Sequence, residues 1–323
     1  MDILDKHTSY LETFLESIQP TDSYNRSTGE LVSMLVEWLQ RHLSYRVDRV
    51  VKSGSFGKGT HVRGYADLDC VMVLNAFTGL GDRRDRGEEV LADIARQINN
   101  TRWAINVHKD YYVVKFTMQK GDVKLDVDLL PTFEVLGHYP PSKDTLEGIY
   151  RKMLQLGGRD VSFYSAPLCQ LQLEFVRLQP TRVKSLIRLV KYWLKVEVGG
   201  QEKPGMRYPK SFAMELICIH VWEKAGSPLR FDMAVAFKAV LKQLENYRSM
   251  KVVWTKHYSR NIAEQAMRAH SITKPILLDP ANPTNNALAW IPQEALDHVA
   301  EIARQSMRRQ LLRSVVLPYQ WDV

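Results

Sequence analysis

The chain has 323 residues, among them 44 Lys and Arg and 36 Asp and Glu, and its formal net charge is therefore +8. With 45% hydrophobic and 25% charged residues it has the composition of an ordinary globular protein, which excludes a fibrous repeat and extensive disorder. Three widely spaced cysteines without a Cys-x-x-Cys pair argue against a disulfide framework or a cysteine-rich zinc site. The excess of basic residues favours a polyanionic partner.

We expect a cytoplasmic location, with the nucleus as an additional one, and no membrane as a partner. The longest apolar stretches, residues 70–74 and 216–222, are far shorter than the ~20 residues that a membrane span needs. The first 25 residues also make a poor signal peptide. Charged side chains stand among their apolar positions, at Asp2, Asp5, Lys6, Glu12 and Glu16.

Apolar periodicity predicts two different halves. Two amphipathic helices open the chain, at residues 4–18 and 31–43. Short β-like runs then follow, with one helix among them: 47–52, 68–74, 88–100 (the helix), 111–118 and 123–130. After Pro140 and Pro141 helical periods dominate, at residues 160–178, 181–197, 211–225, 231–248 and 292–313. Residues 197–209 are expected to form an exposed loop. We therefore predict an α+β protein with domains at residues 1–150 and 151–323.

Two pairs of aspartates stand on the predicted strands. Asp67 and Asp69 are two residues apart at the start of an apolar run, so both side chains point to the same face of the sheet. Asp126 and Asp128 repeat this arrangement, and a neighbouring strand would add a third carboxylate to the first pair. Converging carboxylates suit Mg²⁺, which bridges substrate phosphates. The alternative is that each aspartate ends a strand or caps a turn, although repeated burial of like charges without a metal is costly.

A glycine-rich turn precedes Asp67 and contains Gly54, Ser55 and Lys58. Glycines let the backbone approach a phosphate closely, and free N–H groups with a hydroxyl can hold it. The spacing departs from a Walker A loop, because a glycine and not Ser or Thr follows Lys58. Taken alone, the segment is equally well interpreted as a flexible surface hairpin.

Basic residues form one stripe on the predicted helix 181–197, at Lys184, Arg188, Lys191 and Lys195. This stripe is either a solvated helix face or a site for a phosphate-rich ligand, which would turn the mutual repulsion into attraction. Other conspicuous residues have simpler interpretations. We expect Trp38, Trp193 and Trp222 in the core. We expect a solvated helix face from Arg304, Arg308, Arg309 and Arg313.

The order of the motifs resembles that of polymerase β-like nucleotidyltransferases: Gly54 and Ser55, eleven residues, Asp67-Leu-Asp69, and a later strand aspartate. Longer motifs are similar to the 2′-5′-oligoadenylate synthetase family. They are Gly54-Ser-Phe-Gly-Lys-Gly-Thr60, Asp128-Leu-Leu-Pro-Thr-Phe-Glu-Val-Leu-Gly137, and the segments 180–193, 213–216, 221–223 and 278–284. The resemblance spans nearly the whole chain. It implies a bilobal fold with a mixed-sheet catalytic lobe, a helical lobe and the active site in the cleft between them.

The resemblance also assigns roles to residues. It implies two Mg²⁺ ions bound by the catalytic carboxylates Asp67, Asp69 and Asp128, and ATP as the substrate. The nucleotide-binding positions would be Gly54, Ser55, Arg188, Lys191, Ser211 and Phe212. Double-stranded RNA would contact Lys58, Arg177, Thr181 and Arg182, whereas Leu173 stands where vertebrate members carry a basic residue. The expected enzyme is a monomer that makes 2′-5′-oligoadenylate in innate antiviral signalling and does not bind DNA.

Two other functions stay open. A cyclic dinucleotide synthase of the cyclic GMP-AMP synthase-like receptor class shares the fold and the carboxylates. The departures at Ser211 and Phe212, where the family typically has Gln and Tyr, keep this alternative open. A catalytically silent RNA-binding relative is the second alternative, and the complete set of three aspartates argues against it.

Overall fold

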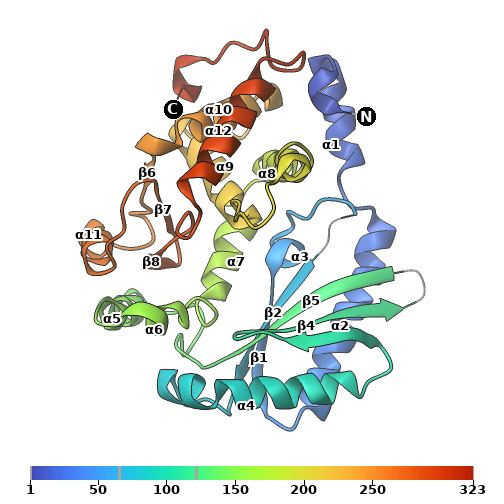
Figure 1. Ribbon diagram of the computed structural model, residues 1–323, viewed down its shortest axis with the longest axis vertical. Coiled ribbons are helices and arrows are strands. Elements are labelled where there is room, and N and C mark those ends of the chain that lie inside the picture. Colours follow the sequence, from blue (N-terminus) through green and yellow to red (C-terminus); the bar gives the residue numbers. More distant parts are fainter. Residues whose placement is uncertain (1, 65–66, 121–122, 323) are drawn as a thin grey trace.

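The computed structural model describes residues 2–64, 67–120 and 123–322, apart from the side chains of Asp67 and Lys120. Two lobes are stacked along the long axis of the molecule, a sheet lobe with α2 and α4 and a larger helical lobe (Figure 1). The prediction of an α+β, bilobal chain is confirmed. No helix in these described ranges is both long enough and apolar enough to cross a membrane.

A five-stranded mixed sheet forms the first lobe, in the order β1-β2-β5-β4-β3. The strands are β1 (Val47–Ser53), β2 (Asp67–Leu74), β3 (Ala104–Lys109), β4 (Val114–Lys120) and β5 (Val123–Thr132). Strands β2 and β5 are parallel, and the other pairs are antiparallel. Alternate residues of the central strands, such as Leu68, Val127 and Phe116, are buried against α2 (Asp22–His42) and α4 (Leu80–Asn99). Burial on this face follows from the alternation of apolar and polar residues.

The helical lobe is built around α9 (Ser211–Lys224), which packs against α8 (Thr181–Trp193) and α10 (Met233–Glu245). Helix α9 is buried on nearly all sides from Ala213 to Trp222, as expected of a helix enclosed by others. The remaining helices are α5 (Lys143–Leu154), α6 (Gly158–Ser162), α7 (Cys169–Arg177), α11 (Arg260–Ala269) and α12 (Gln293–Met307). A small sheet joins β6 (Lys251–Val252), β7 (Ile276–Asp279) and β8 (Asn282–Asn286).

The N-terminal segment packs on the helical lobe, although it precedes the sheet in the chain. Helix α1 (Leu11–Ser17) contacts α8, and the amide of Leu311 donates to the carbonyl of Leu4 at 2.9 Å. Arg309 forms ion pairs with Asp2, Asp5 and Glu197. The expectation of a purely solvated Arg309 is therefore wrong, because its ion pairs link the N-terminal segment to the end of α12. Trp193 and Trp222 are buried as expected.

Several elements differ from the predictions. The sequence pattern did not predict β3, α5, α11 or the small sheet, whose strands have only two to five residues. The helix predicted at 160–178 is interrupted between α6 and α7, where Pro167 cannot donate a backbone hydrogen bond. Helix α5 spans the predicted domain boundary at residue 150, and Tyr150 donates to the carbonyl of Ala281 at 3.1 Å. Short turns of helix complete the chain: Ile3–Asp5, Thr8–Tyr10, Leu194–Val198, Gly199–Gln201, Tyr247–Ser249 and Tyr319–Trp321.

Candidate active site

Two polar rows cross the sheet face that is turned away from α2 and α4. In the parallel pair, Asp69 of β2 is in register with Asp128 of β5, and on the next strand Lys115 is in register with Asp128. The Lys115 ammonium donates to Asp128 Oδ2. The second row follows two residues away, with Asp126 beside Thr117, whose hydroxyl donates to Asp126 at 2.6 Å. The predicted convergence of the two aspartate pairs is therefore present in the strand register.

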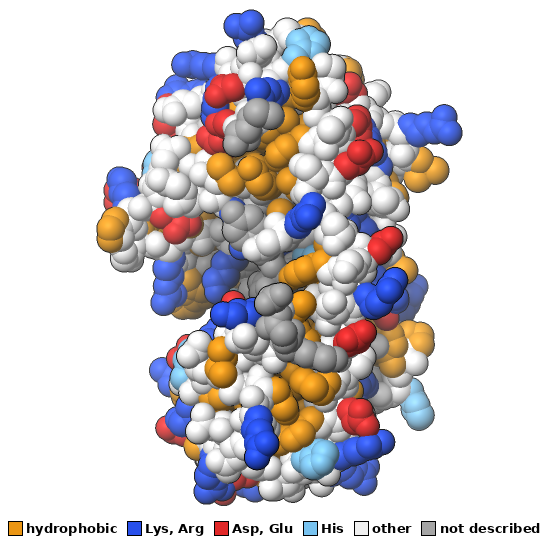
Figure 2. Space-filling model, turned by 90° about the vertical axis from the view of Figure 1, so that its right-hand side faces the viewer, with side chains coloured by type: hydrophobic (Ala, Val, Ile, Leu, Met, Phe, Trp, Pro, Cys, Tyr) orange, Lys and Arg blue, Asp and Glu red, His pale blue; other side chains and the backbone are white. Residues whose placement is uncertain are grey.

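Apolar packing limits this site at one end. Beyond Asp69, the same face of the sheet carries Val51, Val71 and Leu130, which pack against Cys169 and neighbouring residues at the start of α7. Burial strongly raises the pKa of the Cys169 thiol, to about 12, so this sulfur stays a neutral packing group. The carboxylates of Asp69 and Asp128 thus lie beside the area of the sheet that α7 covers. The face in Figure 2 is hollowed between the two lobes, with Lys and Arg side chains along parts of that hollow.

Segment 54–58 is a short helix, α3 (Gly54–Lys58), so the prediction of a glycine-rich turn is wrong in its geometry. Gly54 has φ +73°, and a Cβ there would lie 2.8 Å from Asp69 Oδ2. A Cβ on Gly57 would lie 2.0 Å from the carbonyl oxygen of Lys52. Glycine is thus required because α3 lies directly against Asp69 and the end of β1. Ser55, on the same turn, is buried.

Charged residues from both lobes meet behind α3 around Glu215, which is 1% exposed. Its carboxylate accepts from Lys58 Nζ at 2.8 Å and from Thr60 Oγ1 at 2.9 Å, and Lys191 Nζ lies 3.5 Å away. Burial alone would raise the pKa of Glu215, but the charges of Lys58 and Lys191 and these hydrogen bonds hold it below its ordinary value. This ionic cluster links α3 of the sheet lobe to α8 and α9 of the helical lobe.

Arg188 extends the cluster toward the surface of α8. Its Nη2 donates to the carbonyl of Gly59 at 2.7 Å, whereas Nε and Nη1 are buried without a hydrogen-bond partner in the described part of the chain. Burial lowers the pKa of the guanidinium. Unsatisfied buried donors are costly, so a cation with two of them is a candidate ligand for an anion. The alternative of a solvated basic stripe is wrong for Lys191, which is 3% exposed.

The predicted base-binding residues begin α9. Phe212 is half-buried, and the Lys58 ammonium lies 4.5 Å from the centre of its ring. Ser211 is the first residue of the helix. The structure therefore brings Phe212 to the same ionic cluster that contains Lys191, consistent with one continuous binding surface.

The predicted RNA-contacting residues do not form a single exposed surface. Arg177 and Thr181 are exposed, at the end of α7 and the start of α8. Arg182 forms two hydrogen bonds with the Glu12 carboxylate, at 2.6 and 2.9 Å. Lys58 is 8% exposed and paired with Glu215, so an RNA phosphate could reach it only after this ion pair had broken.

The carboxylate rows fit magnesium chemically. Asp69 and Asp128 supply hard oxygen ligands on adjacent strands. No cluster of three potential ligand residues occurs among the side chains that the structure describes, and Asp67, the third predicted ligand, lies outside that set. The binding of two ions thus stays a prediction.

Sequence comparison identifies the family. Residues 143–323 match the family described as 2′-5′-oligoadenylate synthetase 1, domain 2, C-terminus, and residues 32–133 match the nucleotidyltransferase domain. The chain belongs to the 2′-5′-oligoadenylate synthase family. It is 30% identical over 313 residues to 2′-5′-oligoadenylate synthase 1A of Mus musculus, an alignment that covers 88% of this chain and 83% of that protein. The resemblance inferred from the motifs is thereby confirmed, and the chain is a nucleotidyltransferase.

Another relative in this family is named as inactive. The inactive 2′-5′-oligoadenylate synthase 1B of Rattus norvegicus is 31% identical over 310 residues, covering 88% of this chain and 80% of that protein. Among solved structures, CdnC of E. coli MS115-1 with ATP has a TM-score of 0.61 at 23% identity, over 93% of this chain and 90% of that one. This likeness shows that the two proteins share a fold.

Sequence reasoning missed the partners of the predicted site residues. Lys115 and Thr117 alternate with buried apolar residues on β4, a pattern that places both on the carboxylate face. Glu215 carried a stronger signal, because it is the single charged residue between Phe212 and Ile219. A carboxylate in a wholly apolar helix needs a cationic partner.

Proposed function

We propose that this family member makes 2′-5′-linked oligoadenylate from ATP in a magnesium-dependent reaction. The observation that carries the proposal is the pairing of Asp69 with Asp128 across β2 and β5, close to α3. The guanidinium of Arg188, with two unpartnered donors, contacts the residue that follows α3 and supplies a cationic site for phosphate. The names of the related synthases support adenylate as the substrate.

Each group has a defined role in this proposal. Asp67, Asp69 and Asp128 would hold two Mg²⁺ ions, which neutralise phosphate charge and favour deprotonation of the attacking hydroxyl when bound. Arg188 binds the triphosphate and stabilises the charge that develops on the pyrophosphate. Lys191 is buried beside Glu215 and would join Arg188 only after that ion pair had opened. Gly54 allows α3 to lie directly against Asp69, and the face of the Phe212 ring opposite Lys58 would stack on a base.

We further propose that double-stranded RNA raises the activity by binding near the junction of α7 and α8. Arg177 and Thr181 are accessible there for phosphate contacts, which recognise a duplex by shape. RNA phosphates would compete with Glu12 for Arg182, because the Glu12 carboxylate already accepts from both terminal nitrogens of the guanidinium. RNA would therefore bind more tightly to the state in which Arg182 has left Glu12. Its binding would raise the population of that state, in which the ion pairs around Glu215 are also rearranged.

A second candidate is the synthesis of a cyclic dinucleotide. It is favoured by Ser211 and Phe212 at the base-binding position, where the Lys58 ammonium lies over one face of the Phe212 ring. This contact would alter the selection of the base, so the donor could be a nucleotide other than ATP.

The decisive experiment identifies the product. Purified protein would be incubated with Mg²⁺ and ATP, or with ATP and GTP, in the presence and absence of duplex RNA. Linear products that resist a 3′-5′-specific nuclease and yield to a 2′-5′-specific one support the proposal. A product with the mass of a cyclic dinucleotide would replace it by the second candidate. No product under any condition, from protein that still binds RNA, would indicate a silent relative.

A further inference from the structure

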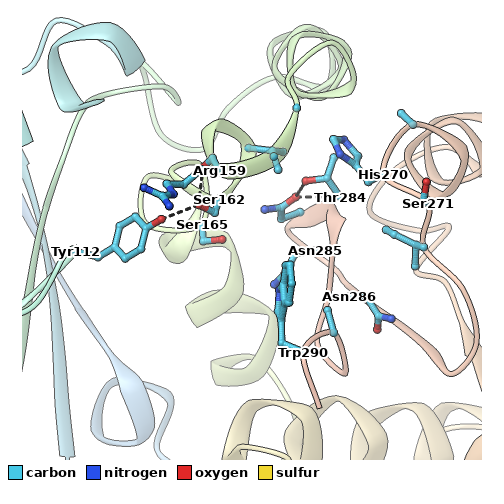
Figure 3. A pocket seen from close by; sticks show the side chains of 17 residues that line it. Tyr112, Arg159, Ser162, Ser165, His270, Ser271, Thr284, Asn285, Asn286 and Trp290 are labelled. Atoms are coloured by element: carbon cyan, nitrogen blue, oxygen red, sulfur yellow. Dashed lines mark hydrogen bonds between the residues drawn. The ribbon is translucent and has the colours of Figure 1, made fainter. Parts of the chain in front are cut away.

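A second cavity lies far from the carboxylates, between α6, the end of α11 and strand β8. Its volume is about 750 Å³, within the range of small-molecule sites. In Figure 1, α7 separates α6 and β8 from α3 and the start of β2, and none of the predicted catalytic residues lines this cavity. Figure 3 shows side chains from α6, β8 and the segment after α11 around one open space.

Two polar side chains, Asn282 and His270, line the cavity. Asn282 is 1% exposed, and its Oδ1 accepts from the amide of Thr284 at 3.0 Å and from its hydroxyl at 2.6 Å. Those bonds fix the orientation of the amide, so its Nδ2 is the group that would donate to a ligand.

His270 supplies the second group. Its Nε2 is buried and without a partner among the described residues, whereas the backbone of Met153 forms a hydrogen bond with the ring. Burial lowers the pKa of this imidazole despite that bond, so the ring is neutral. With Nδ1 donating to the Met153 carbonyl, Nε2 is left as an acceptor. The wall therefore offers one donor and one acceptor.

A cation, Arg159, and an aromatic side chain, Trp290, also line the cavity. Arg159 has no ion pair in the described part of the chain, and its guanidinium lies 5.3 Å from the centre of the Tyr111 ring. Trp290 is 86% exposed and has φ +66°, a conformation that is rare for a large side chain and recurs at ligand sites. None of the described residues that line the cavity is an Asp or Glu, which favours an anionic ligand.

We propose that this cavity binds a nucleotide at a site separate from the catalytic cleft. The base stacks on Trp290 and bonds with Asn282 and His270, and the phosphate pairs with Arg159. Any nucleobase carries both hydrogen-bond donors and acceptors on its edge. Asn282 and His270 therefore favour a ligand with a nucleobase but do not determine which base it is. This proposal does not depend on the proposed catalytic activity, because it uses none of the residues of that site.

Binding of AMP to the full chain would be measured by calorimetry, in EDTA and in an Arg188→Ala background that weakens the catalytic cleft. We expect Trp290→Gly to weaken AMP binding by about tenfold or more, the usual loss when a stacking ring is removed. Gly tolerates the positive φ of residue 290, so this variant should fold normally. The matched control is Tyr319→Gly, which removes an equally exposed ring, 97% accessible, elsewhere on the chain.

Two further variants separate the polar contacts. Arg159→Gln removes the cation at the rim and, because Arg159 is exposed, should weaken AMP binding at an unchanged melting temperature. Asn282→Asp keeps the oxygen that accepts from Thr284 but replaces the amide donor by a carboxylate, so it should also weaken AMP binding, and it should lower the melting temperature because Asn282 is buried. Adenosine and inorganic phosphate should each bind more weakly than AMP. A photoreactive 8-azido-AMP should label peptides from 158–165 or 282–290. Labelling of the peptide that contains Phe212, or AMP affinity equal in all variants, would overturn the proposal.

Discussion

Replacing Glu215 by Gln should destabilise the protein strongly. The carboxylate is 1% exposed and balances Lys58 and Lys191, whose side chains are themselves 10% and 4% exposed. Removing one partner of a buried ion pair leaves an uncompensated charge, at a cost of about 3–5 kcal/mol. Here two ammonium groups would lose their common partner, so we expect the upper part of that range, a large share of a typical stability of about 5–15 kcal/mol.

Urea unfolding followed by tryptophan fluorescence measures this effect as a shift of the midpoint. The matched control is Glu223→Gln on the same helix, where the carboxylate pairs with an exposed Lys256 at 3.3 Å and should contribute less than about 1 kcal/mol. The two variants should also differ in their pH dependence. Because the folded pKa of Glu215 is lowered, its stabilisation is present above the unfolded pKa of about 4.3 and is lost as the pH falls below it. Glu215→Gln should lack this acid-side loss. Equal midpoints for the two variants would refute the charge-balance argument.

Three further predictions concern the arginines. Arg188→Ala should raise the KM for ATP by about tenfold to a hundredfold, since charged hydrogen bonds contribute about 1.5–3 kcal/mol, as steady-state kinetics would show. Arg309→Ala should release the N-terminal segment, lowering stability by about 1 kcal/mol in thermal unfolding and exposing residues 2–17 to protease. Arg177→Glu combined with Thr181→Glu should abolish stimulation by duplex RNA while preserving basal activity, because both side chains are exposed and neither contributes to the ion pairs of Glu215.

Each of these has a control in the same element or lobe. Lys184→Ala, one turn before Arg188 and without an ion pair among the described residues, should leave the KM nearly unchanged. The exposed Arg308 should be replaceable by Ala without a change in melting temperature. Lys274→Glu, an exposed charge reversal in the helical lobe, should keep RNA stimulation. If variant and control behaved alike in any pair, the role assigned to that arginine would be wrong.

The central part of the fold was accessible from the sequence because its signals are local. The apolar run that follows Asp69 in β2 and the alternation of apolar and polar residues from Val123 to Leu129 in β5 predict both strands and the face of Asp69 and Asp128. Strands β6 to β8 have no such alternation, since they are too short and almost fully buried. Register is a long-range property, so the direct pairing of Asp69 with Asp128 could be inferred only as a possibility.

The candidate site was predicted less completely than the fold. A basic stripe on a helix can face solvent or the interior, and the sequence of α8 does not distinguish Arg188 and Lys191 from Lys195. Tertiary packing decides this question, because the buried carboxylate of Glu215 on α9 forms ion pairs with Lys191 and Lys58. Glycines were likewise interpreted as signals of a turn, whereas at Gly54 and Gly57 the requirement is the close approach of neighbouring atoms.

The central claim is that Asp128, paired with Asp69, carries nucleotidyl transfer in this chain. It is tested most directly by pyrophosphate release from ATP and Mg²⁺, compared between Asp128→Asn and Asp126→Asn. The two aspartates stand two residues apart on the same face of β5, but only Asp128 is in register with Asp69. We predict that Asp128→Asn abolishes release and Asp126→Asn retains most of it, with both variants folded. An active Asp128→Asn enzyme beside an inactive Asp126→Asn enzyme would contradict the account.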